Sequence, residues 1–432
     1  MATAERPVTK TTEGNARVSA RMDVRALTPA NGLKEYWYPA IEARKVGKKP
    51  VGMKICGEQV VFFPGKEKGE VSALANVCPH RGGSLMHGDC HYPGTISCPY
   101  HGWTFNGDGD VLAVLPEGPE SQVPGKIQHR AYPTKTLRGL VWVWMGEDEP
   151  APIEEDVPPE FFHNDGQVLY AYEVWKVNWR ASVENGGDAH VPYVHHDAFL
   201  LRINPMGLMG IRSAKTNIIN DRAATFGVRR AAPATGANGK APEADAPPRY
   251  AVQQAEFPGL GKWPKHMYRD LWKWATTWSG RRRYRGESND KSEEWGGFVH
   301  HLPAIVRLDY HTHSYSRINV PIDAENTRQI YVHYTRHSNW FAKLREKVLF
   351  HVWHRWAMYS DFSVQDFSAI EPQRYDTREY LSSTDSHVVV WRRLLLKARG
   401  LGNIETTEKA ITEAERFSHN LQEEVGVTPE KW

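Results

Sequence analysis

The sequence predicts an α+β protein in which a small all-β domain precedes a larger domain of helices packed against an antiparallel sheet. Three observations predict this fold class. The chain has 432 residues, which is too long for one ordinary core. Short β-rich runs separated by turn signals fill residues 50–145, and strand-like and helix-like runs mix after that point. Aromatic residues make up 11% of the chain, which excludes a wholly disordered protein.

The first domain is predicted from its strand-like runs and one hairpin signal. Residues 106–109 read Asn-Gly-Asp-Gly between the runs WTF and VLAVL, and this pattern is typical of a tight hairpin. Further strands are expected at VGMKIC, EQVVFF, VSALANV and LVWVWM. The acidic, Pro-rich stretch 146–162 suits an exposed connector. We therefore expect a tail and first helix at 1–34, the all-β domain at 35–150 and the second domain at 151–432.

In the second domain we expect strands at 168–177, 299–308, 313–320 and 329–335, and helices at 179–190, 341–370 and 384–399. Such a mixture indicates helices on an antiparallel sheet. Residues 231–248 are rich in Ala, Pro and Gly, which predicts a flexible surface loop. Residues 262–286 mix Trp with Lys and Arg. We interpret them as an amphipathic insertion or an interface rather than a nucleic-acid patch.

Composition narrows the setting of the protein. A formal net charge of +3 does not indicate a nucleic-acid partner. No apolar stretch approaches the roughly 20 residues that a membrane span needs, and the N-terminus lacks the apolar core of a secretory signal. The 4 cysteines are too few for a disulfide scaffold. We expect a cytoplasmic protein whose cysteines serve metal or catalytic chemistry.

The most specific motif is a pair of Cys/His segments. Cys78 and His80 form a C-x-H pair, and Cys98 and His101 form a C-x-x-H pair further on. Two Cys and two His could make a tetrahedral zinc site. However, each pair lies in a Gly-containing loop between β runs, and this resembles the Rieske signature. In such centres two thiolates hold one iron of a [2Fe-2S] cluster and two imidazoles hold the other.

Neighbouring residues support a cluster at these loops. Gly82 and Gly102 would let the loops approach the cluster without a Cβ clash. Tyr100 could direct its hydroxyl at a ligand sulfur. Cys56 and Cys90 lie outside the motif and are expected to be ordinary buried or surface thiols.

A second candidate metal site begins in residues 184–196, which gather acids and histidines among apolar residues. Surface charge and metal ligation both remain open for this window. A regular helix would turn His190 and His195 about 140° apart, so they converge only if Pro192 breaks the helix. His196 remains a rival ligand.

The third ligand is predicted from a later segment. Helical spacing places Phe362, Asp366 and Ile370 on one stripe, which puts a carboxylate on an apolar face. Such a group must be paired, protonated or bound to a cation. Two His and one carboxylate with open positions are the facial triad of non-haem Fe(II) oxygenases.

Together these motifs resemble the alpha subunit of Rieske non-haem iron ring-hydroxylating oxygenases. The resemblance rests on the Cys/His pairs, then NW at 178–179, EN-x-x-D at 184–188, H-x4-H at 190–195 and QD-x4-E-x-Q at 365–373. It covers the chain from Gly32 to about residue 402. The segments NWRASVENGGDAH and VVVWRRLLLKARGLG are more similar to the homotrimeric branch, which includes carbazole dioxygenase and oxoquinoline monooxygenase. The implied fold is a Rieske domain followed by a helix-grip catalytic domain.

The resemblance also implies roles for individual residues. Cys78, His80, Cys98 and His101 would hold the [2Fe-2S] cluster, and His190, His195 and Asp366 the mononuclear iron. Asn185, Gly186, Phe362 and Ser363 would face the substrate.

Asp188 would couple the two centres by bridging the first iron histidine to His101 of a neighbouring subunit. The family spacing is D-x-x-H, whereas this chain has one residue fewer between Asp188 and His190. Gly186 and Gly187 could absorb that difference. Glu184 is the next acid to test.

The function implied is that of a terminal oxygenase that uses O₂ to hydroxylate or dihydroxylate an aromatic or heteroaromatic compound, as a homotrimer. No G-x-G-x-x-G fingerprint is present in a strand-turn-helix setting, so a ferredoxin and/or flavin reductase would deliver electrons from NAD(P)H. One alternative is an oxidative N- or O-dealkylase. A more distant one is a Rieske electron carrier or zinc-bearing binding protein, which would need no carboxylate at Asp366.

Overall fold

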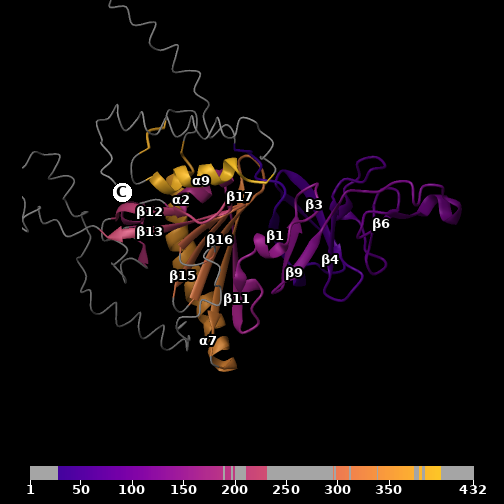
Figure 1. Ribbon diagram of the computed structural model, residues 1–432. Coiled ribbons are helices and arrows are strands. Elements are labelled where there is room, and N and C mark those ends of the chain that lie inside the picture. The colour runs from indigo at the N-terminus through magenta and orange to yellow at the C-terminus, as the bar shows by residue number, and fades with distance from the viewer. Residues whose placement is uncertain are drawn as a thin grey trace, which may run out of the picture.

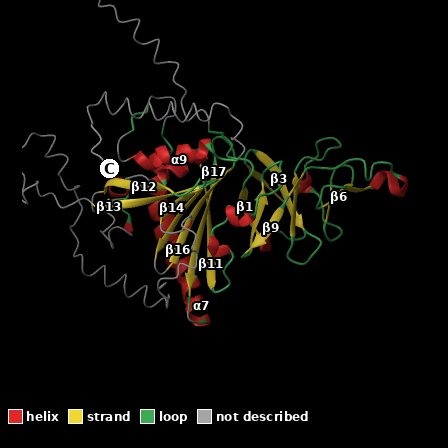
Figure 2. Cartoon of the chain, in the orientation of Figure 1, coloured by secondary structure: helices red, strands yellow, loops and turns green. Residues whose placement is uncertain are grey.

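The computed structural model describes residues 28–187, 190–195, 198–199, 211–230, 295, 298–310, 313–337, 339–373, 379–381 and 385–399. The predicted loop 231–248 and insertion 262–286 lie outside these residues. Of the predicted tail and first helix at 1–34, the structure describes residues 28–34, and these form no helix. Over the described residues the chain forms antiparallel sheets with helices packed on the largest one, which confirms the α+β class (Figures 1 and 2).

The N-terminal half is built from three small sheets. Their strand orders are β1-β10-β9, β2-β3-β4-β8 and β5-β6-β7. The predicted hairpin at 106–109 joins β6 to β7. The bounds are β1 Trp37–Glu42, β2 Val51–Ile55, β3 Glu58–Pro64, β4 Val71–Ala75, β5 Thr95–Ser97, β6 Trp103–Asn106, β7 Val111–Val114, β8 Ala131–Tyr132, β9 Thr134–Leu137 and β10 Leu140–Trp144.

The C-terminal half contains a seven-stranded sheet of order β11-β17-β16-β15-β14-β13-β12. The predicted strand at 299–308 is two strands, because the chain turns at residues 302–304, where Pro303 cannot donate to a sheet ladder. The bounds are β11 Gly166–Trp175, β12 Ile211–Ile218, β13 Ala223–Arg230, β14 Phe298–His301, β15 Ile305–Tyr310, β16 His313–Pro321 and β17 Thr327–Arg336.

Helices cover this sheet and carry or flank the predicted metal ligands His190, His195 and Asp366. They are α2 Trp179–Asn185, α3 Val191–Val194, α7 Trp340–Leu349, α8 Val364–Ile370 and α9 Ser386–Leu396. Two π-helical segments, η8 Phe350–His354 and η9 Trp356–Ser363, lie between α7 and α8. Within the described part of the chain, no helix is long and apolar enough to cross a membrane.

The predicted helices at 179–190 and 341–370 differ from the structure in informative ways. The first ends at Asn185, because the next two residues are glycines, which have low helix propensity. The second covers the expected residues but has π-helical register in its middle, a feature that often marks functional sites.

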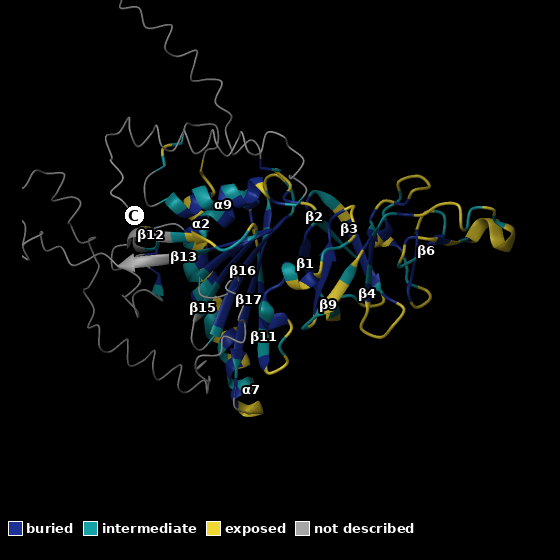
Figure 3. Ribbon diagram, viewed as in Figure 1, coloured by how far each residue is buried: buried dark blue, intermediate teal, exposed yellow. Residues whose placement is uncertain are grey.

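One hydrophobic core joins the two halves of the chain. It includes Trp142 and Trp144 from β10, Phe161 from the connector, Trp179 from α2 and Trp391 from α9. β11 contributes one face to this core and the opposite face to the helices, as its two-residue side-chain period requires. Buried residues occur on strands of both halves, whereas exposed residues gather beyond β6 and at the end of α7 (Figure 3).

A buried ion pair closes the junction between the halves. Asp156 is fully buried and accepts a hydrogen bond from the Trp37 N–H at 3.0 Å. Its other oxygen pairs with Arg399, which follows α9. The Arg399 guanidinium also lies 4.1 Å from the centre of the Tyr36 ring. Burial raises the pKa of Asp156 to about 7, although the charge of Arg399 acts in the opposite direction.

We predict that Arg399→Met costs roughly 2 kcal/mol of unfolding free energy at pH 8.5 and clearly less at pH 5.5. The raised pKa means that the folded carboxyl is mostly protonated at pH 5.5 and needs no cation, whereas it is ionised above about pH 7. Urea unfolding at both pH values measures the difference. Lys397→Met, which removes an exposed pair with Asp221, is the control and should change little. An equal loss at both pH values would contradict the prediction.

Candidate metal centres

The two Cys/His loops share the same pattern of backbone hydrogen bonds. One follows β4 and the other joins β5 to β6. In each, a glycine N–H donates to the carbonyl of the cysteine four residues earlier, at 2.9 Å for Gly82 to Cys78 and 3.0 Å for Gly102 to Cys98. Both cysteine N–H groups donate five residues onward, at 2.8 and 2.7 Å. The two glycines have φ of +75° and +63°, in the left-handed region that favours glycine.

The structural reason for the first of these glycines differs from the prediction. A Cβ at Gly82 would meet no atom within 4 Å, so its backbone conformation, not a steric clash, requires glycine. The close approach occurs one residue later. A Cβ at Gly83 would lie 3.1 Å from the Cys98 Sγ atom, so this glycine lets the second cysteine reach the first loop. Sequence reasoning missed Gly83 because this glycine has no counterpart in the second loop, whereas Gly82 and Gly102 each lie four residues after a cysteine.

The four candidate cluster ligands separate into an inner and an outer pair. The Cys78 and Cys98 side chains are buried, and burial raises the pKa of Cys78 to about 11, with the neighbouring Cys98 acting in the same direction. His80 is exposed, His101 is half-buried, and their ring centroids lie 4.7 Å apart. Two buried thiols behind two outward imidazoles fit a group with one sulfur-bound and one nitrogen-bound metal. A cation would also offset the cost of burying thiolates.

Tyr100 does not play the predicted part. Its ring lies 3.7 Å from the centre of the His101 ring, and the residue is 59% exposed. No hydrogen bond joins its hydroxyl to either loop cysteine within the continuous described range 28–187. Tyr100 therefore covers an imidazole rather than a sulfur. Of the two cysteines outside the motif, Cys56 is buried and Cys90 is half-buried.

The second centre brings together three residues that the sequence singled out. The Asp366 Oδ1 atom lies 2.9 Å from Nε2 of both His190 and His195, and the two nitrogens lie 3.2 Å apart. His195 and Asp366 are buried. Without a cation, both imidazoles must donate protons to one oxygen. Two nitrogens and one oxygen converging in this way fit a metal ion, and this is the sole such group in the described ranges.

Short-range geometry explains how two histidines five residues apart converge. They flank the single turn of α3 instead of lying within one helix, with His190 before its first residue and His195 after its last. Pro192 lies in the first turn, where proline is tolerated. The break that we expected at Pro192 instead lies upstream, after Asn185.

The polar side chains around Asp366 hold this buried carboxyl in its charged form. Burial by itself raises the pKa of this carboxyl, but hydrogen bonds from His190 and His195 and the positive charge of Arg317 outweigh burial and hold the pKa well below its usual range. Burial lowers the pKa of His190, which keeps this imidazole neutral and able to act as a ligand. The site thus combines an anionic carboxylate with a neutral imidazole at His190.

Two further polar residues contact Asp366. Asn185, at the end of α2, donates from Nδ2 to Oδ1 at 3.3 Å. Arg317, in β16, places Nη1 3.5 Å from Oδ2 and is only 4% exposed. Sequence reasoning missed Arg317, because an arginine within the strand run SYSRINV has no local signal that separates an inward from an outward side chain.

The predicted substrate-facing residues lie close to this centre but differ in their contacts. The Phe362 ring stacks on the His195 ring, with centroids 3.6 Å apart. The buried Ser363 hydroxyl donates to the Met358 carbonyl at 2.8 Å, so its hydrogen bond lies within the π-helical segment η9. Gly186 lies against β15 and β16, and a Cβ there would come within 2.6 Å of Val306 Cγ2.

Three other residues need separate mention. Asp188 and His196 lie outside the described residues. Glu184 forms a two-pronged ion pair with Arg392 of α9, at 2.7 and 2.9 Å. This acid is therefore engaged in fixing α2 to α9.

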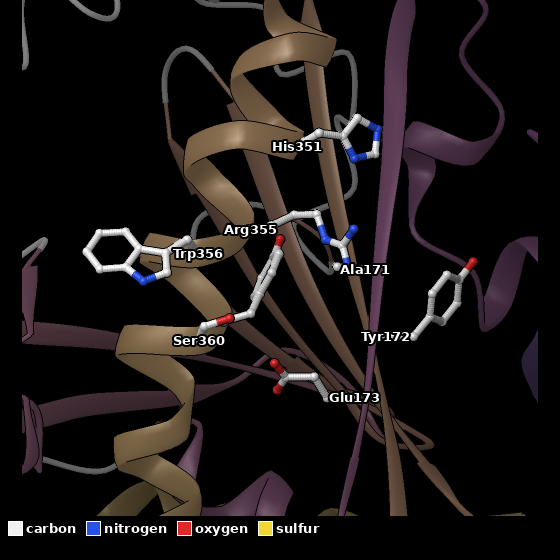
Figure 4. A pocket seen from close by; sticks show the side chains of 8 residues that line it. Ala171, Tyr172, Glu173, His351, Arg355, Trp356 and Ser360 are labelled. Carbon is white, nitrogen blue, oxygen red and sulfur yellow. The ribbon is translucent and has the colours of Figure 1, made fainter.

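A separate cavity of about 230 Å³ lies between β11 and the π-helical segments (Figure 4). Figure 4 shows Glu173 on the strand side and Arg355 on the helical side, and Tyr359 and Ser360 also line the cavity. The Glu173 carboxylate accepts hydrogen bonds from Tyr331 and Trp175. None of the candidate metal ligands lines this cavity.

Comparison with known proteins finds matches to two segments of the chain. Residues 36–127 match the Rieske [2Fe-2S] domain, and residues 144–238 match the homotrimeric ring hydroxylase family. The terminal oxygenase component of carbazole 1,9a-dioxygenase from Metapseudomonas resinovorans is 31% identical over 44% of this chain and 51% of its own. The chain spans about half the length of the curated relatives it matches.

Solved structures extend the likeness of fold to almost the whole chain. The terminal oxygenase of carbazole 1,9a-dioxygenase from Novosphingobium sp. KA1 has a TM-score of 0.67 and 24% identity, and the match covers 90% of this chain and 99% of that one. An oxygenase in complex with ferredoxin, from carbazole 1,9a-dioxygenase, has a TM-score of 0.62 and 20% identity, with 87% and 91% covered. The match to the Rieske domain favours an iron-sulfur cluster over zinc at the Cys/His loops.

We predict that Asp366→Ala removes the mononuclear metal but leaves the cluster, because the two sets of ligands do not share residues. Metal analysis should fall from about three irons per chain to about two, with the visible spectrum of the cluster unchanged. Glu371→Ala, an exposed acid on the same helical run, is the matched control. Retention of the third iron by Asp366→Ala would show that the carboxylate is not a ligand.

Proposed function

This chain carries the Rieske domain and the homotrimeric ring hydroxylase segment of the Rieske ring-hydroxylating oxygenases, and from that premise we propose that it is a terminal oxygenase component acting on aromatic or heteroaromatic compounds. The observation that carries the proposal is the convergence of His190, His195 and Asp366 in a chain that also holds two Cys/His loops. An electron carrier would need only the loops.

When bound, the cluster would supply single electrons and the mononuclear iron would supply O₂ activation. The chain's own residues give these groups their setting. Cys78 and Cys98 would hold the inner side of the cluster, and His80 and His101 the side that faces solvent. His190, His195 and Asp366 would occupy one face of the iron and leave the remaining positions open. Phe362 would orient the His195 ring by stacking on it.

The surroundings of the loops and the matched proteins suggest the partners. We propose that a ferredoxin or flavin reductase delivers the electrons, as suits a family in which an oxygenase-ferredoxin complex is known. Near the exposed His80, Tyr100 packs on His101 and Leu115 lies beside Gly102, and both side chains are exposed, which suits a transient protein contact. We also propose a homotrimer, as the name of the matched family suggests.

Asp188 remains a proposed link between the two centres. If it bridges His190 to a cluster histidine of a neighbouring subunit, Asp188→Asn should keep both metals and the trimer but slow electron transfer from cluster to iron by orders of magnitude. Stopped-flow single-turnover oxidation of the reduced cluster measures this rate. A wild-type rate in the variant would place the link elsewhere.

The activity itself is tested by product analysis. The purified protein, a surrogate ferredoxin and reductase, NAD(P)H and ¹⁸O₂ are incubated with a panel of fused aromatics, N-heteroaromatics and methoxylated arenes. We expect ¹⁸O in a hydroxylated ring product, and none with Asp366→Ala although its cluster is still reduced. Formaldehyde from methoxylated arenes would instead indicate oxidative dealkylation. A reducible cluster without any oxygenated product and without a third iron would indicate an electron carrier.

A further inference from the structure

The two oxygens of Asp366 have different neighbours. Oδ1 faces the two histidine nitrogens and the Asn185 amide. Oδ2 faces the Arg317 guanidinium, at 3.5 Å from Nη1. A carboxylate can bind a metal through one oxygen or both. In this site a permanent cation lies against the second oxygen, whereas the histidines share the first.

Arg317 is itself held firmly. Its Nη2 donates to the Ser182 carbonyl at 2.8 Å and to Asn185 Oδ1 at 3.3 Å, both from α2. Its guanidinium carbon lies 5.4 Å from the centre of the Trp175 ring. These contacts use the planar fork of arginine, which lysine cannot reproduce.

The neighbouring backbone also makes room for the guanidinium. A Cβ at Gly186 would lie 3.0 Å from the Arg317 Nη2 atom. The two histidines donate to Oδ1 of Asp366. The guanidinium instead lies on the oxygen that faces away from the histidines.

We propose that Arg317 is a positioning residue that restricts Asp366 to one ligating oxygen and so keeps positions on the metal open. The inference rests on the proposed function of the His190, His195 and Asp366 site. Three protein atoms leave three positions of an octahedron, whereas four would leave two. The positive charge of Arg317 also weakens the attraction of the site for a divalent cation. Arg317 would therefore lower the metal affinity of the site while keeping more coordination positions open.

The test uses Co²⁺ as a spectroscopic probe on the full chain from which the mononuclear iron has been removed. We expect Arg317→Met to bind Co²⁺ roughly tenfold more tightly, because a nearby positive charge is lost and the second oxygen is released. Its visible bands should shift, because the second carboxylate oxygen replaces another ligand of the metal. Turnover should fall although metal is retained. Arg317→Lys keeps the charge and should bind Co²⁺ within about threefold of wild type.

Arg307→Met is the matched control, because Arg307 is an equally buried arginine in the adjacent strand that pairs with Glu160 instead. Whatever its stability, its Co²⁺ affinity and spectrum should equal those of wild type. Equal or weaker Co²⁺ binding by Arg317→Met, with the cluster spectrum intact as evidence of folding, would overturn the inference. Failure of the wild-type chain to bind Co²⁺ at all would instead overturn the proposed function.

Discussion

Burial of one carboxylate is the constraint on which the second half of the molecule depends. Asp366 can stay ionised in the interior only because imidazoles, an amide and a guanidinium surround it. Those groups come from α2, the turn around α3, and β16, while Asp366 itself lies on α8. Each of these elements must therefore be fixed relative to the others to within the length of a hydrogen bond. The seven-stranded sheet and the ion pair between Glu184 and Arg392 supply that fixed frame.

A different constraint applies to the two cluster loops. Each loop places its cysteine inside and its histidine toward solvent. Because a buried thiolate is costly, the two cysteines need a cation to offset that cost. Both loops use the same hydrogen-bonded turn, and a motif of a few residues is enough to encode it. This is why the Cys/His spacing was so informative, because almost all of the geometry is local to each loop.

The predictions succeeded where the determining interactions are local. The hairpin at 106–109, the strands around it and the helical stripe that carries Asp366 all follow from patterns a few residues long. Arg317, Gly83 and the π-helical register depend on contacts between distant segments, and no local pattern encodes those. The pairing of β1 with β10, which joins residues about 100 positions apart, was missed for the same reason. Asp188 and His196 lie outside the described residues, so their predicted roles remain predictions.

The core shared by the two halves has a consequence for how the chain folds and is handled. Trp142, Trp144 and Trp179 are buried against residues from both sides of the connector, so neither half covers its own apolar surface. A fragment cut near residue 150 would expose these tryptophans to water and invite aggregation. The boundary visible in the sequence thus separates two chemistries but not two folding units. We expect the distance between the centres within one chain to be set by packing, with no hinge to adjust it.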